Sequence, residues 1–183
     1  MENARIPIQI DIGFGDVVTP AAIEVTYPVL LDFPAPVLPA YPRESVVAEK
    51  FQAMVMLGIA NSRMKDFFDL WVLAQRFEFQ GPALCQAIRA TFERRRTPVP
   101  AAVPMALSSE FAQDRTKQTQ WRAFLGKGKL DTGGAELDQV IDALHDFLMP
   151  AAQAIVASGL LDLAWPARGP WSSRPLPPAT EMR

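Results

Sequence analysis

The densest group of ionisable side chains lies in the run NSRMKDFFDL, which begins at position 61. At helical spacing Asp66 heads an apolar stripe, and Asp69 lies beside it, within reach of Lys65. A carboxylate at the head of a core-facing stripe needs cationic partners, because its desolvation costs several kcal/mol. Arg63, three residues earlier, and Lys50, on the preceding predicted helix, are the candidate partners. Such a cluster could bind phosphate oxygens.

Each of these residues also has a purely structural interpretation. Asp66 and Asp69 could simply complement the dipole at a helix start and form an intrahelical ion pair. Lys50 lies at the border of the apolar stripe of a helix predicted over 44–58, where lysines commonly extend the ammonium into water. The number of charged groups on one side of two successive helices favours a functional site.

A separate candidate lies near the start of the chain. Residues 5–12 alternate strictly, with four isoleucines on one face, which predicts a strand half-buried against a core. Asp11 lies on the opposite face, just before a glycine turn. A carboxylate in that position could hold a divalent metal, or could be a solvated residue that ends the strand. A second strand is predicted over 23–27, and the two could form a hairpin.

The elements that must position these residues divide the chain into three parts. Residues 1–43 contain the predicted strands and a proline-rich linker, residues 44–164 form a helical domain, and residues 165–183 form a loose proline-rich tail. Six helices are predicted, over 44–58, 63–78, 81–95, 105–113, 116–125 and 135–158, with Pro150 breaking or kinking the last. The predicted fold class is therefore α+β, mostly helical.

Composition excludes several classes of protein. The chain has 183 residues, a net charge of −2, one cysteine and one histidine. These counts exclude a disulfide framework and a multi-cysteine zinc site, and they give no global basic signature for nucleic acid. No apolar run is long enough for a membrane span, and the first residues carry no secretion signal, so we expect a cytoplasmic protein that does not interact with membranes.

Two motifs resemble those of a known family. The run YPRESVVAEKFQAMV from Tyr41, followed by NSRMKDFFDL, is similar to the AbiEii/AbiGii nucleotidyltransferase toxins, in which a helix with A-E-K precedes one with R-x-(K/R)-D-x-x-D-L. The strand IDIGFGD from Ile10 and the helix end TFERR from Thr91 also fit this family. The resemblance implies a β-hairpin remnant of a nucleotidyltransferase sheet, followed by a helical bundle. It implies Mg²⁺-dependent transfer of a nucleotide from an NTP, with GTP as one candidate and tRNA as one acceptor.

The resemblance also implies roles for individual residues. Lys50, Asp66 and Asp69 match residues expected to be catalytic, and Asp11 matches a strand carboxylate expected to bind metal. Arg63 and Lys65 lie where substrate phosphate would be bound.

One departure from the family pattern is visible in the sequence. The G-S and D-x-D elements that precede these motifs in the family are absent before Asp11. We therefore expect a truncated chain that is inactive alone and that self-associates through the exposed edge of the strand over 6–12. The alternative is a non-catalytic helical interaction module that binds an antitoxin or RNA.

Overall fold

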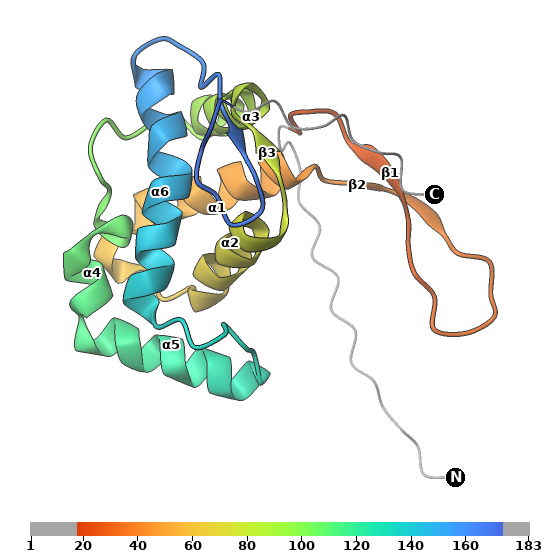
Figure 1. The fold of residues 1–183 in the computed structure, drawn as a ribbon, viewed down its shortest axis with the longest axis horizontal. Coiled ribbons are helices and arrows are strands. Elements are labelled where there is room, and N and C mark those ends of the chain that lie inside the picture. The colour runs from red at the N-terminus through yellow and green to blue at the C-terminus, as the bar shows by residue number, and fades with distance from the viewer. Residues whose placement is uncertain (1–17, 174–183) are drawn as a thin grey trace.

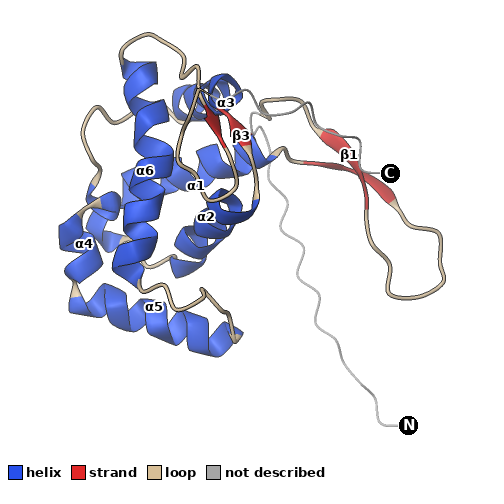
Figure 2. Cartoon of the chain, viewed as in Figure 1, coloured by secondary structure: helices blue, strands red, loops and turns tan. Residues whose placement is uncertain are grey.

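The computed structural model describes residues 18–173, and within them six α-helices form one packed body (Figure 1). The helices are α1 (Arg43–Leu57), α2 (Met64–Arg76), α3 (Gly81–Arg94), α4 (Ser109–Gln113), α5 (Arg115–Gly128) and α6 (Leu137–Val156). Single 3-10 turns cover Gly58–Ala60 and Met105–Leu107. The predicted α+β, mostly helical class is confirmed, and Figure 2 shows how little of the chain is strand.

The core is built from the apolar stripes that the helical periodicity predicts. Helix α1 lies against α3 and α2, and α6 contacts α2, α3 and α4. Phe67 of α2 stacks on Phe111 of α4, with ring centroids 5.2 Å apart, which ties the start of α2 to the far side of the bundle. Burial of these stripes supplies most of the driving force for folding.

The structure corrects one helix prediction and narrows a second. The helix predicted over 105–113 is a 3-10 turn followed by α4, because the Ser108 hydroxyl accepts a hydrogen bond from the Phe111 N–H and caps a new helix there. Of the break or kink predicted at Pro150, the break is absent, because α6 continues through Pro150 to Val156. Packing of the helix against its neighbours outweighs the loss of one backbone hydrogen bond.

A two-stranded antiparallel hairpin projects from the helical body (Figure 1). Strand β1 (Ile23–Thr26) pairs with β2 (Val37–Ala40), so the strand predicted over 23–27 is present, while its partner comes from the proline-rich linker. The strand predicted over 5–12, with Asp11, lies outside the described residues.

The segment after α6 differs from the expected loose tail. Strand β4 (Ala164–Trp165) pairs with β3 (Phe79–Gln80), and the Trp165 indole N–H donates to the Ala74 carbonyl at 2.9 Å. Trp171 stacks on Phe147. The buried indole of Trp165 and the partly buried indole of Trp171 hold residues 165–173 on the core despite their prolines. Residues 174–183 lie outside the described part.

The close approach of this segment to α3 predicts the effect of a glycine substitution. A Cβ on Gly81 would collide with the Leu161 carbonyl oxygen and lie 2.8 Å from that of Leu163, both backbone atoms. We expect Gly81→Ala to lower the free energy of unfolding by about 1–3 kcal/mol, measured by urea denaturation.

Gly126→Ala is the matched control for this prediction. No atom lies within 4 Å of a Cβ at this position in α5, so alanine should be neutral or add up to about 1 kcal/mol. Equal stability of the Gly81→Ala and wild-type proteins would contradict the packing described for residues 161–163.

Candidate functional site

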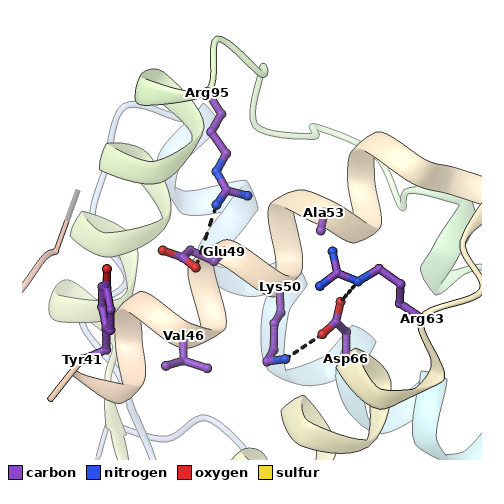
Figure 3. Close-up of a pocket in the computed structure, with 8 residues that line it drawn as sticks. All are labelled: Tyr41, Val46, Glu49, Lys50, Ala53, Arg63, Asp66 and Arg95. Atoms are coloured by element: carbon purple, nitrogen blue, oxygen red, sulfur yellow. Dashed lines mark hydrogen bonds and ion pairs between the residues drawn. The ribbon is translucent and has the colours of Figure 1, made fainter. Parts of the chain in front are cut away.

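A cavity of about 190 Å³ opens between α1, the start of α2 and the end of α3. Its lining consists of Tyr41, Val46, Glu49, Lys50, Ala53, Arg63, Asp66 and Arg95 (Figure 3). Four of these recur at spacings of three and four along α1 and therefore share one helical face. The opposite face of α1 is buried in the core. The fold thus presents a single charged face of α1 to the cavity.

Lys50 bridges the two acids of α2. Its Nζ lies 2.6 Å from Oδ1 of Asp66 and 2.8 Å from Oδ2 of Asp69. Only the short 3-10 turn and three residues separate α1 from α2, which brings these side chains to the same level. The sequence predicts Lys50 within salt-bridge reach of Asp66 or Asp69, and in the structure it reaches both.

Asp66 is the most deeply buried member of the cluster. Its side chain is 3% exposed, and its second oxygen, Oδ2, lies 2.9 Å from Nε of Arg63 (Figure 3). This second contact is an ion pair without hydrogen-bond geometry. Lys65 pairs with Asp69 on the outer side, where the lysine is largely exposed. The sequence analysis therefore groups the five residues of this cluster correctly, although Lys65 lies at its rim and not in the cavity lining.

The electrostatics of the cluster favour its charged form. Burial by itself lowers the pKa of Lys50, but hydrogen bonds and charges from Asp66 and Asp69 outweigh it and leave the pKa above its ordinary value. Burial by itself raises the pKa of Asp69, but the same interactions with Lys50 and Lys65 leave that pKa below its ordinary value. Both groups are therefore ionised across the neutral pH range.

A second network of polar side chains reaches the cavity through Arg95 and Glu49. Arg95 donates to Gln52 Oε1 at 2.8 Å and lies 3.8 Å from a Glu49 carboxylate oxygen, while Gln52 donates to Thr97. Sequence analysis treats Arg95 only as part of a basic helix end and does not identify Glu49 or Tyr41. The available signal is that Glu49 directly precedes Lys50 in the A-E-K motif.

The described residues do not fit a magnesium site by themselves. Between residues 18 and 173 no group of three aspartate, glutamate, histidine or cysteine side chains could hold a metal ion. Both acids of α2 already face cations, and Oδ2 of Asp66 is enclosed beside Arg63. The expected metal ligand, Asp11, lies outside the described residues.

The cluster does retain donors for an anion. An ammonium has three N–H donors, and the two carboxylates engage two of those of Lys50. Arg63 uses Nε for Asp66, which leaves the N–H groups of its exposed Nη end free for a planar, two-point contact. The site is thus a pocket whose cations are held in place by the buried Asp66 and the half-buried Asp69, a suitable arrangement for phosphate oxygens.

Fold and pocket together define a mostly helical domain with a cavity lined by paired acidic and basic side chains. The sequence profile of the family described as nucleotidyl transferase AbiEii toxin, type IV TA system, matches residues 1–148, and the chain belongs to this family. No curated protein and no solved structure matches the chain. Among the described residues no helix is long and apolar enough to cross a membrane.

Removal of Lys50 tests the bridge between the helices. Lys50→Met leaves the buried Asp66 carboxylate with only Arg63, so we expect a loss of about 1–3 kcal/mol in the free energy of unfolding at neutral pH. Lys65→Met removes an exposed i,i+4 pair and should cost no more than about 0.5 kcal/mol.

The pH dependence of the stability lost in Lys50→Met follows from the directions of the pKa shifts of Asp69 and Lys50. A lowered aspartate pKa contributes stability that is lost as pH falls through the folded-state pKa, and a raised lysine pKa contributes stability that is lost only at high pH. The difference between wild type and Lys50→Met should therefore stay constant between about pH 5 and pH 9 and shrink below about pH 4. A Lys50→Met protein as stable as wild type would contradict this account.

Proposed function

We propose that the cavity binds the triphosphate of an NTP during transfer of a nucleotide to an RNA acceptor. The observation that supports this most directly is the position of Lys50 and Arg63, both held by the buried carboxylate of Asp66 with donors to spare. In the proposed reaction an RNA hydroxyl attacks the α-phosphorus in line, a new phosphodiester forms, and the bond to pyrophosphate breaks. Cations facing the phosphates would stabilise the charge that develops on the leaving group.

In this proposal the acids of α2 position the cations. Asp69 accepts from Lys50 and Lys65, and its pKa is lowered, so it would be a weak general base near neutral pH. Asp66 is enclosed and faces two cations, so it holds Lys50 and Arg63 at the cavity. Lys65, at the rim, would contact phosphate only beyond the cavity itself.

The remaining family properties are proposals for this chain. We propose that Mg²⁺ is required, with Asp11 contributing to its site, that the acceptor is a tRNA, and that GTP is among the nucleotides used. We further propose that the chain acts in the cytoplasm and has a cognate antitoxin. The reason for proposing Mg²⁺ is general, because a divalent ion commonly neutralises the charge of a transferring triphosphate.

A second candidate, a helical module that only binds a protein or RNA, is favoured by one feature. The hairpin carries exposed apolar side chains, including Ile23, Tyr27 and Leu38. Exposed apolar surface of this kind commonly marks an interaction site, including self-association. Such a module would bind its partner without any affinity for NTPs, which separates the two proposals.

Nucleotide binding by the 183-residue chain tests the leading proposal. We expect GTP or ATP to bind in isothermal titration calorimetry, and Arg63→Gln to weaken binding about tenfold or more, because a charge-assisted contact to phosphate is lost. Lys127→Met, which removes an exposed cation from α5, is the control and should leave the affinity unchanged. Absence of binding to either nucleotide, with or without Mg²⁺, would contradict the proposal.

A further inference from the structure

Lys117 of α5 is a buried lysine. The residue is 7% exposed, and its Nζ donates to the backbone carbonyl of Asn61 at 2.9 Å. The ammonium also lies 5.3 Å from the centroid of the Phe111 ring. Among residues 18–173, no carboxylate lies within ion-pair distance of Lys117. Burial of a cation costs free energy, so its placement on this carbonyl calls for a reason beyond packing.

The residue that Lys117 contacts controls the start of α2. Asn61 is fully buried, its N–H donates to Gly58, and its side-chain Oδ1 accepts from the Arg63 N–H at 2.9 Å. The Nδ2 group of Asn61 has no hydrogen-bond partner. A buried amide with an unpaired donor is destabilising, so Asn61 is a costly residue for a purely structural turn.

These contacts form one continuous path to the cavity. Lys117 fixes the Asn61 backbone, the Asn61 side chain fixes the Arg63 N–H, and the Arg63 carbonyl accepts from the Asp66 N–H at 2.8 Å. The Arg63 guanidinium then meets the Asp66 carboxylate. Helix α5 contributes no residue to the cavity lining, yet it reaches the cavity through this path.

We propose that Lys117 is a positioning residue of the phosphate pocket, which holds residues 61–63 so that Arg63 faces Asp66 and the bound anion. The identity of that anion as a triphosphate rests on the proposed function, whereas the control of Arg63 by Lys117 does not. A side chain that served only to fill space would be replaced without effect on Arg63 by an apolar side chain of similar length.

Lys117→Met is the direct test, since methionine keeps most of the side-chain volume and removes the ammonium. Native-state hydrogen exchange of the Arg63 amide is the readout that does not depend on any ligand. We expect exchange at Arg63 to become about tenfold faster or more, because the carbonyl anchor of the loop is lost. Lys127→Met removes the same charge from the exposed side of α5 and should leave this exchange rate unchanged.

GTP binding provides the second readout. Lys117→Met should lower the affinity for GTP about tenfold in the wild-type background. It should lower that affinity no further in the Arg63→Gln background, because Lys117 acts through Arg63. An unchanged exchange rate at Arg63 in a folded Lys117→Met protein would overturn the proposal. Faster exchange at Arg63 with an unchanged affinity for GTP would also overturn the proposal, provided that Arg63→Gln does lower the affinity for GTP.

The two proposals fail separately. If wild-type protein binds no nucleotide, the proposed function fails, and the exchange measurement alone decides whether Lys117 holds Arg63. If Lys117→Met does not fold, hydrogen exchange at Arg63 and GTP affinity are measured on Lys117→Gln, which keeps a neutral hydrogen-bond donor. Failure of both variants to fold would assign Lys117 to global stability and overturn the positioning role.

Discussion

The Asp66 carboxylate, buried at the start of α2, is the constraint on which the rest of the site depends. A buried carboxylate is stable only with charged partners and hydrogen bonds. Lys50 from α1 and Arg63 from the preceding loop supply the charges, and their contacts to Asp66 are 2.6 and 2.9 Å. The carboxylate therefore fixes how α1, the loop and α2 meet at the cavity.

This arrangement has a consequence for binding. Cations that are already held in position lose little conformational freedom when an anion arrives, so preorganisation improves affinity. The acids lower the net positive charge of the pocket, but they leave one ammonium donor on Lys50 and the exposed end of Arg63 for a ligand. Lys117 lies outside the cavity and contributes to the same preorganisation, because it holds the loop that carries Arg63.

Local periodicity accounts for what the sequence predicts well. The apolar stripes predict the helices, and the short connection after α1 predicts that Lys50 meets Asp66. The partnership of Gln52 with Arg95 and Thr97 depends on tertiary contacts across more than forty positions, which no local pattern contains. The burial of Trp165 is missed for the same reason, since its proline-rich surroundings indicate a loose chain while its indole packs on distant helices.

A double-mutant cycle between Lys50 and Asp66 is the most direct test of this account. The free energies of unfolding of wild type, Lys50→Met, Asp66→Asn and the double variant would be measured by urea denaturation at neutral pH. The account predicts a coupling energy of at least about 1 kcal/mol, with the double variant more stable than the sum of the single losses implies. Additive losses would show that Lys50 and Asp66 do not depend on each other, and would contradict the central role of this ion pair.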